Sequence, residues 1–325
     1  MKPVIPAIDD PIFDQVVCRP ALPLDTPGML ELTSHIWEGD DYVPKVWQEW
    51  LFDHQGLLAV AEFQGKVVGI GKLTRLSQED WWLEGLRVHP EYEGNRIASR
   101  IQKYLLEIWD KNGSGSIRFA TISTREPVKH LAHVNDFQSV AEYSTFKSKL
   151  IDILPKKSNP FRQIESHEST KVVDWLISQP REKLSFGLMN LGWQFAPPKE
   201  NYLTDHFEEN RIWWWQRDRG VLIMVEKKIG SEIWGRVQLL ACDLNDLVNL
   251  LSDTHILAAR SNYAGVTWLA PLIPGIEQIT AKAGFNRDWE SSLLVFEKSY
   301  STKKFIPDWC KVSSNCHGII SAAKI

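Results

Sequence analysis

The sequence has few cysteines, no excess of basic residues and no long apolar run. Its four cysteines are too scattered for a disulfide framework in a chain of 325 residues. A net charge of −4 lacks the basic footprint of nucleic-acid binding, so we expect no nucleic-acid partner. No stretch approaches the ~20 apolar residues of a membrane span, and residues 1–14 are too polar for a signal peptide. We therefore predict a cytoplasmic protein without a membrane partner.

One group near the C-terminus has the residue types of a metal site. Cys310 and Cys316 lie close together, and His317 follows directly. A structural zinc site takes four ligands, however, and only one pair is close in sequence here. We therefore expect two free thiols in a tail, and no metal.

Length and composition predict a globular chain with two domains. Apolar residues make up 43% and charged residues 24%, as in ordinary soluble domains. A polar stretch at 155–160 contains Pro155 and Pro160 and is typical of a linker. We therefore predict a first domain at 1–154, a second at 161–300 and a tail at 301–325.

The first half has the pattern of an α/β sandwich. A strand at 16–20 and two helices, at 26–37 and 45–52, precede three antiparallel strands. The tight turn Gln64-Gly65 joins the first two of these strands. A helix, a strand, a short helix and a last strand follow. The expected ranges after the two helices are 57–63, 66–76, 81–88, 95–111, 117–122, 127–134 and 139–147.

The second half repeats this plan in outline, which suggests a tandem duplication. Ala283-Gly284-Phe285 lies between a helix and a strand, where the first half has Asn135-Asp136-Phe137. The aromatic run 212–216 is expected to serve core and interdomain packing rather than a ligand platform. No glycine cradle follows the strand at 235–242, so a second copy has lost the cofactor. The expected elements are 170–177, 182–188, 213–216, 220–228, 235–242, 245–251, 266–270, 276–283 and 291–298.

The segment Leu83 to Ser99 carries the chemistry. It is a strand, a short turn and the start of a helix, and a helix start offers unpaired N–H groups and the positive end of a dipole. Such a start binds a pyrophosphate readily. Gly94 permits a close backbone approach, and Ala98 and Ser99 are small enough to lie against a ligand.

Leu86-Arg87-Val88-His89-Pro90, followed by Tyr92 to Ala98, resembles the acetyl-CoA motif of the GCN5-related N-acetyltransferase (GNAT) superfamily. The resemblance implies a GNAT fold, a mixed and mostly antiparallel central sheet flanked by helices, in two tandem domains with a degenerate second copy. It implies acetyl-CoA as co-substrate, pantetheine on backbone groups of Leu86 and Val88, and an oxyanion-stabilising N–H there. The implied cofactor contacts are Leu86, Arg87, Val88, Glu93, Gly94, Asn95, Arg96, Ile97, Ala98 and Ser99.

The segment departs from the motif in two places. Glu93 stands where the family usually has a basic residue, and Arg96 replaces the second glycine. The Arg96 guanidinium either pairs with a phosphate or faces solvent.

Glu84 is the candidate general base. Amines are mostly protonated at pH 7, because their pKa values lie at about 8 to 10.4, so a carboxylate beside the thioester must take a proton. Alternatively, Glu84 only binds the substrate ammonium or a neighbouring side chain. The family's usual acid is a tyrosine, but none lies near Ala132. His133 is our candidate, with nearby His130 or solvent as alternatives.

The loop between the first two helices is expected to cover the acceptor. Asp40, Asp41 and Tyr42 would suit a cationic amine, although the loop could equally carry solvated charges. This loop and the motif together resemble the histidine N-acetyltransferase-like branch, which implies the α-amine of a small amino acid. A non-catalytic acyl-CoA sensor and a protein or peptide N-acetyltransferase remain as alternatives.

Overall fold

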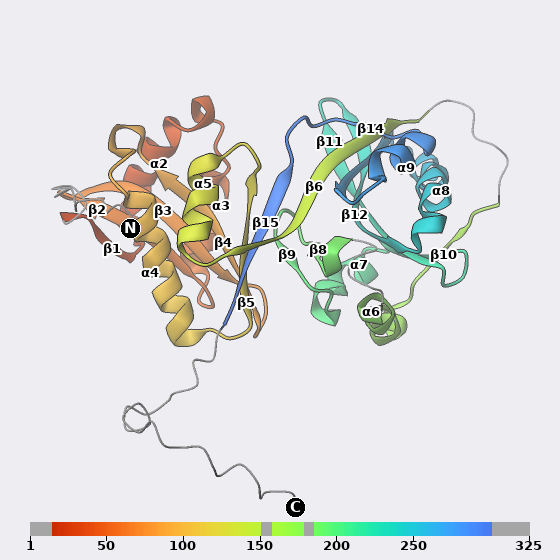
Figure 1. Cartoon of the computed structure of the whole chain (residues 1–325), viewed down its shortest axis with the longest axis horizontal. Helices are drawn as coiled ribbons and strands as arrows, with labels where there is room; N and C mark the ends of the chain where they lie inside the picture. Colours follow the sequence, from red (N-terminus) through yellow and green to blue (C-terminus); the bar gives the residue numbers. More distant parts are fainter. Residues whose placement is uncertain (1–14, 151–157, 179–184, 301–325) are drawn as a thin grey trace, which may run out of the picture.

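The computed structural model describes residues 15–150, 158–178 and 185–300, and within them thirteen strands form one continuous sheet (Figure 1). The metal hypothesis for Cys310, Cys316 and His317 lies outside these residues, as do residues 155–157 of the predicted linker. No helix that the structure describes is both long enough and apolar enough to span a bilayer.

The first half follows the predicted order of elements. Pro27 lies in the first turn of α2, where its missing N–H costs no helical hydrogen bond. Helix α2 ends at Ser34, before the expected end at residue 37. The elements are β1 (Val17–Pro20), α2 (Thr26–Ser34), α3 (Val43–Phe52), β2 (Leu57–Phe63), β3 (Lys66–Arg75), β4 (Asp80–Val88), α4 (Ile97–Asn112), β5 (Ser116–Ile122), α5 (Glu126–Val134) and β6 (Gln138–Lys149).

The second half departs from the prediction in several places: β7, α7 and β14 were not expected, and α8 extends to Arg260, beyond the expected end at residue 251. Ser185–Gly187, within the expected helix at 182–188, forms a short 3-10 turn with Phe186 at φ 54°, and the chain continues as a hairpin. The helix prediction is therefore wrong for the described part of that range. The elements are β7 (Phe161–Gln163), α6 (Ser169–Ser178), β8 (Met189–Asn190), β9 (Phe195–Ala196), α7 (Thr204–Glu208), β10 (Ile212–Trp215), β11 (Gly220–Ile229), β12 (Glu232–Cys242), α8 (Leu247–Arg260), β13 (Gly265–Pro271), α9 (Ile276–Lys282), β14 (Asn286–Arg287) and β15 (Leu293–Ser299).

The two halves exchange their last strands. Strand β15 lies between β5 and β6, in the middle of Figure 1, and β6 in turn pairs with β13. From one edge the order is β1-β2-β3-β4-β5-β15, and from the other it is β7-β10-β11-β12-β13-β6. The two halves therefore have the same strand order, and each completes the sheet of the other.

The helix before each exchanged strand ends in the same way. Asp136 and Gly284 adopt left-handed conformations, with φ of 63° and 84°. The next residue in each half is a buried phenylalanine, whose N–H bonds to a carbonyl five residues earlier. These bonds are Phe137 N to Ala132 O at 3.0 Å and Phe285 N to Thr280 O at 2.9 Å. The correspondence expected from the sequence therefore extends to the cap geometry.

Helices cover both faces of the first-half sheet. Ala59 and Ala61 of β2 pack in the cluster that contains α4, whereas Leu58 and Val60 pack in the cluster that contains α2 and α3. Alternate residues of a strand point to opposite faces, so α4 lies on one face and α2 and α3 on the other.

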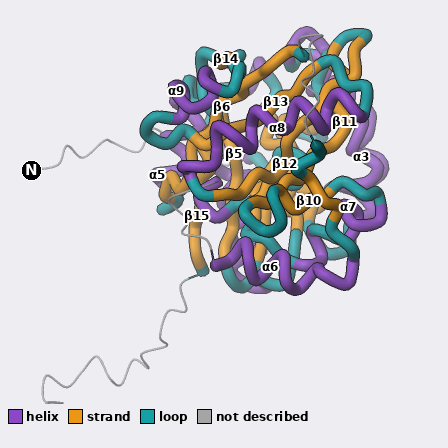
Figure 2. The backbone as a smooth tube through the Cα atoms, turned by 90° about the vertical axis from the view of Figure 1, so that its right-hand side faces the viewer, coloured by secondary structure: helices purple, strands orange, loops and turns teal. Residues whose placement is uncertain are grey.

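The aromatic run 212–216 lies in the second-half core. Trp214 and Trp215 are fully buried, and their indole N–H groups donate to Glu168 at 3.3 Å and Asp253 at 2.9 Å. Strand β10 pairs with β7 and β11, all within the second half. Figure 2 views the molecule from the side of the second half, which contains β10 and β11. The run therefore has the expected core role, and its strand partners are not interdomain.

Candidate active site

Strands β4 and β5 run parallel and then separate. Only Asp80, Trp81 and Trp82 of β4 pair with β5, and none of the described residues beyond Trp82 continues this pairing. Backbone groups of β4 from Leu83 to Val88 therefore lack a strand partner on the β5 side.

A β-bulge changes the direction of β4 near the point where β4 and β5 separate. Ile70 pairs with Arg87 and Lys72 pairs with Glu84, so Gly71 alone faces both Gly85 and Leu86. Gly85 has φ 65°, and a Cβ there would lie 2.7 Å from the Trp50 ring. The close approach of α3 and the left-handed backbone both require glycine at this position.

Glu84 lies just before the bulge and is half-buried. Its Oε1 accepts hydrogen bonds from Thr74 Oγ1 at 2.5 Å and from Gln194 Nε2 at 3.0 Å. Burial raises the pKa of Glu84, although these hydrogen bonds and nearby Lys72 act against the rise. Such a carboxyl group can exchange a proton closer to neutral pH than an exposed glutamate can.

A fully buried lysine lies directly across the sheet from Glu84. Lys72 is the cross-strand partner of Glu84, and its ammonium bonds to Asp53 and to the carbonyl of Leu73. Sequence reasoning did not identify Lys72 or Gln194. The period-2 pattern of β3 places Lys72 on the α3 face, but nothing in the sequence connects Gln194 to Glu84.

The turn before α4 presents backbone donors to open space. Gly94 and Arg96 are left-handed, with φ of 84° and 56°, and a Cβ added to Gly94 would have no atom within 4 Å. The Asn95 amide stabilises the turn by donating to Tyr92 O at 3.0 Å. Ile97, Ala98 and Ser99 form the first turn of α4, whose N–H groups have no partner within the helix. This geometry fits a diphosphate.

The side chains of Glu93 and Arg96 are both exposed at this turn. The Arg96 guanidinium is therefore accessible to an anion, as one of the two alternatives requires. Leu86 and Val88 lie on the separated part of β4, as expected for backbone contacts with a ligand.

The structure contradicts the predicted substrate contact of Asp41. The side chain of Asp41 is fully buried, and its two oxygens accept from Arg87 Nε at 2.8 Å and Arg87 Nη2 at 3.1 Å. Arg87 also stacks on Trp37, 4.7 Å from the ring centre. This pair ties the loop to β4, so it leaves neither the Asp41 carboxylate for a substrate nor the Arg87 side chain for a phosphate.

Asp40 and Tyr42 flank Asp41 but have different surroundings. The Asp40 carboxylate is exposed and lies 3.8 Å from the Lys45 ammonium. The Tyr42 ring packs edge-on against Trp50. Burial raises the pKa of Tyr42, with Glu84 and Asp41 acting in the same direction and Arg87 in the opposite one. Tyr42 therefore belongs to the surroundings of Glu84.

His133 is exposed on α5, and its ring lies edge-on to Phe296 of β15. The contacts described for it do not include Glu84. Its role as general acid stays a prediction.

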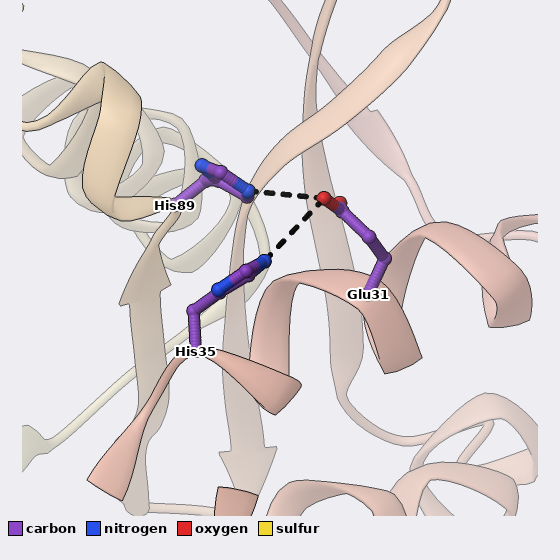
Figure 3. A group of neighbouring side chains, drawn as sticks. All are labelled: Glu31, His35 and His89. Atoms are coloured by element: carbon purple, nitrogen blue, oxygen red, sulfur yellow. Dashed lines mark hydrogen bonds and ion pairs between the residues drawn. The ribbon is translucent and has the colours of Figure 1, made fainter. Parts of the chain in front are cut away.

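Glu31 of α2 and His35, which directly follows α2, meet His89, which follows β4 (Figure 3). Glu31 Oε1 lies 3.1 Å from His89 Nε2 and 3.7 Å from His35 Nε2. The N–H of Glu91 points at His89 Nδ1 at 3.2 Å, so the ring proton is on Nε2 and is donated to Glu31. A histidine that binds a metal through Nε2 instead needs the lone pair of Nε2, and it usually donates the N–H of its other ring nitrogen. The group therefore fits a hydrogen-bonded cluster that fixes the start of the motif turn, and not a metal centre.

The corresponding place in the second half lacks this chemistry. Strands β12 and β13 also run parallel over three residues, ending at Val237. Two residues later stands Leu239, whereas the first half has Glu84 two residues after Trp82. Leu239, Leu240 and Ala241 line an apolar cavity of about 390 Å³. The second half therefore has a similar strand separation without a carboxylate.

Residues 27–136 match the sequence model of the acetyltransferase (GNAT) family. A search of curated protein sequences gave no match. Among solved structures, a GCN5-related N-acetyltransferase from Sphaerobacter thermophilus is 12% identical with a TM-score of 0.59, over 88% of this chain and 96% of that one. Another from Anabaena variabilis is 11% identical with a TM-score of 0.56, over 88% and 73%.

The GCN5-related glucosamine N-acetyltransferase region of a fungal multi-domain GH3 β-N-acetylglucosaminidase is also similar. It is 12% identical with a TM-score of 0.60, over 87% of this chain and 38% of that protein. Likeness at these identities shows the fold alone. The chain has the α/β GNAT fold, and the match to residues 27–136 supports a relationship of its first half to the GNAT acetyltransferases.

Proposed function

We propose that this protein is an N-acetyltransferase that transfers the acetyl group of acetyl-CoA to a primary amine. The observation that carries the proposal is the unpaired edge of β4, which joins Glu84 at its bulge to the open helix start at Gly94. Acetyl-CoA would supply the acyl group as a thioester. The chain supplies backbone donors, a base and a wall for the acceptor.

The cofactor contacts divide between strand and helix. Leu86 and Val88 lack a strand partner on the β5 side, where their backbone groups would bind pantetheine, and one N–H there would stabilise an oxyanion. The N–H groups from Gly94 to Ser99 would bind the diphosphate, because donors and dipole converge there. The exposed Arg96 would pair with a phosphate oxygen.

Glu84 would act as the base. The amine must lose a proton before it attacks, and Oε2 of Glu84, to which no described residue donates a hydrogen bond, would accept this proton directly or through one water. The raised pKa of Glu84 brings it nearer to that of the amine. His133 or solvent would donate a proton to the leaving thiolate of the coenzyme.

We further propose that the acceptor is the α-amine of a small amino acid. Tyr42, beside Glu84, and the exposed Asp40 would lie near its ammonium group. This assignment rests on the resemblance of the loop and the motif to the histidine N-acetyltransferase-like branch.

We propose that the second half is a tandem copy that has lost the activity. The shared strand order and the matching phenylalanine caps support a duplication. Leu239 in place of a carboxylate supports the loss of function. In this view the domains at 1–154 and 161–300 are the two copies, joined through their exchanged strands.

The test is release of thiol from acetyl-CoA by the purified full chain, with free amino acids and short peptides as acceptors. Turnover with amino acids supports the proposal. Turnover with peptides alone would instead establish a peptide N-acetyltransferase. Acetyl-CoA binding without turnover on any amine would establish a sensor and overturn the proposal.

A further inference from the structure

We propose that Gln194, from the second half, is a positioning residue that orients the Glu84 carboxylate in the first half. The inference rests on the proposed function, because it assigns a second-half residue to the site where Glu84 acts. Thr74 and Gln194 both donate to Oε1. Among the residues that the structure describes, no hydrogen bond reaches Oε2, which this arrangement leaves for the acceptor.

The β8–β9 hairpin holds Gln194 in a defined place. Asn190 Oδ1 accepts from the N–H groups of Gly192 at 2.9 Å and Trp193 at 2.8 Å. Gly192 and Trp193 are left-handed, with φ of 92° and 79°. Leu191 N donates to Gln194 O at 2.7 Å and closes the loop. Three hydrogen bonds and two left-handed residues thus fix the turn that presents Gln194.

The next residue anchors the hairpin in the interface between the halves. Phe195 is 1% exposed and stacks on Tyr143 of β6, with ring centres 5.0 Å apart. It also lies 6.0 Å from Trp82 of β4, two residues before Glu84. Because Phe195 packs against the same strand that carries Glu84, the Gln194 amide and the carboxylate keep a fixed relation.

An amide suits this task because it carries no charge. Lys72 from β3 stabilises the ionised form of Glu84, Glu49 from α3 opposes it, and Tyr42 from the loop is a further titratable neighbour. None of these three is hydrogen-bonded to the carboxylate in the structure. The two neutral donors Thr74 and Gln194 therefore orient the group without cancelling the charge that accepts the proton.

The experiment compares Gln194→Leu with the wild type in three measurements. These are the pH dependence of kcat and KM for acetyl transfer, the Glu84 pKa by ¹³C NMR, and acetyl-CoA affinity by calorimetry. The Glu84→Gln variant identifies the NMR signal. Loss of a donor to the ionised form raises the Glu84 pKa, so the acid limb of the kcat profile moves to higher pH. At pH values on this acid limb, kcat of Gln194→Leu is about tenfold below that of the wild type. Acetyl-CoA affinity stays unchanged.

Two variants guard against a merely structural effect. Gln48→Leu removes an exposed glutamine from α3 and leaves the Glu84 pKa unchanged. Gln194→Asn shortens the side chain and keeps its polarity, so it shifts the pKa in the same direction and replaces Gln194→Leu if that variant misfolds.

An unchanged Glu84 pKa in Gln194→Asn and Gln194→Leu would overturn the proposal, as would an equal shift in Gln48→Leu. If the wild type acetylates no amine, the proposed function fails by itself. The NMR titration still decides whether Gln194 acts on Glu84.

Discussion

At Glu84, burial and hydrogen bonding act in opposite directions on one carboxylate. Burial favours the protonated form and raises the pKa, whereas donors from Thr74 and Gln194 favour the ionised form. The balance keeps the group available as a base. Because a base must be ionised, activity should fall as the pH drops through the raised pKa, and remain high above it.

Replacing Glu84 with glutamine tests this role. Glu84→Gln should lower kcat/KM for acetyl transfer about 10²-fold near neutral pH, the usual contribution of a positioned base. The acid limb assigned to Glu84 should disappear, and acetyl-CoA affinity should not change. Steady-state kinetics between pH 5 and pH 9 measure both effects. Glu107→Gln, on the exposed face of α4, is the control. Full turnover of Glu84→Gln across this range would remove Glu84 from the mechanism.

The sequence predicted Glu84 but not its partners, and the reason is physical. Glu84 lies two residues before the motif that begins at Leu86, so the local sequence was enough to make it a candidate. The Gln194 contact joins residues 110 positions apart, and the Arg87–Asp41 pair joins residues 46 positions apart. Long-range pairing of this kind depends on how elements pack, which a single sequence does not specify.

The turn before α4 combines two left-handed residues with an open surface. Gly94 and Arg96 are both left-handed, and no atom of the described residues lies within 4 Å of a Cβ built on Gly94. Another exposed glycine has the same backbone conformation without this setting. Gly65, in the hairpin between β2 and β3, has φ 78° and open space around its missing side chain.

These two glycines give a matched pair. Gly94→Ala and Gly65→Ala should each lose roughly 1–2 kcal/mol of unfolding free energy, because alanine is strained at positive φ. Only Gly94→Ala should also weaken acetyl-CoA binding, by about tenfold or more, because its methyl group enters the diphosphate site. Urea denaturation and calorimetry provide the two readouts. Equal coenzyme affinity in the two variants would contradict the assigned cradle.

Element prediction worked where periodicity was strong. The long strands and α4 have clear alternation or helical spacing, and the structure has them within a few residues of the expected bounds. Strands β8 and β9 have two residues each, too few to establish a period. The helix expected at 182–188 is wrong for the described residues 185–188, where a turn with left-handed Ser185 and Phe186 precedes the hairpin, and no sequence pattern indicated that turn.

On the scale of the whole molecule, the exchanged strands make the two halves interdependent. Phe296 of β15 is 2% exposed and stacks on Phe119 of β5 at 5.3 Å, within the first-half core. It comes from the last strand described, far from β5 in the sequence. Such an arrangement could not be predicted from strand patterns, because a pattern shows which face is buried but not which strand lies alongside.

Truncating Phe296 should destabilise the first half from the far end of the chain. Phe296→Ala should cost about 3–5 kcal/mol of unfolding free energy and speed hydrogen exchange first in β5 and α5. Phe285→Ala, in the second-half core, should cost a similar amount but speed exchange first in α8 and β13. Hydrogen exchange with mass spectrometry distinguishes the two. Faster exchange confined to the second half in Phe296→Ala would contradict the exchanged arrangement.

A buried charge network joins the halves near the start of β4. Asp80 accepts from Arg118 at 2.9 Å and from Lys199, of the second half, at 2.6 Å, and Arg118 also bonds to Glu297 of β15. Burial alone would raise the pKa of Asp80, but bonds from Lys199, Ser77 and Arg118 outweigh it and lower the pKa. The stabilisation is therefore present above the unfolded pKa of about 3.9, and is lost as the pH falls through the lower folded value.

Asp80→Asn should accordingly lose roughly 3 kcal/mol of unfolding free energy at pH 7. Its deficit relative to wild type should shrink as the pH falls below about 4, because Asp80 of the unfolded wild-type chain binds a proton there while the folded carboxylate still resists protonation. Denaturant unfolding at a series of pH values checks this. Asp218→Asn, at an exposed turn, should change stability by less than about 0.5 kcal/mol. A deficit that is constant down to the lowest pH would argue against the network.

The most direct measurement is calorimetric titration of acetyl-CoA into the folded full chain. The account predicts saturable binding with one site per chain, because only the first half combines the separated strand with the open helix start. Absence of binding heat at several temperatures, or two equivalent sites per chain, would contradict it.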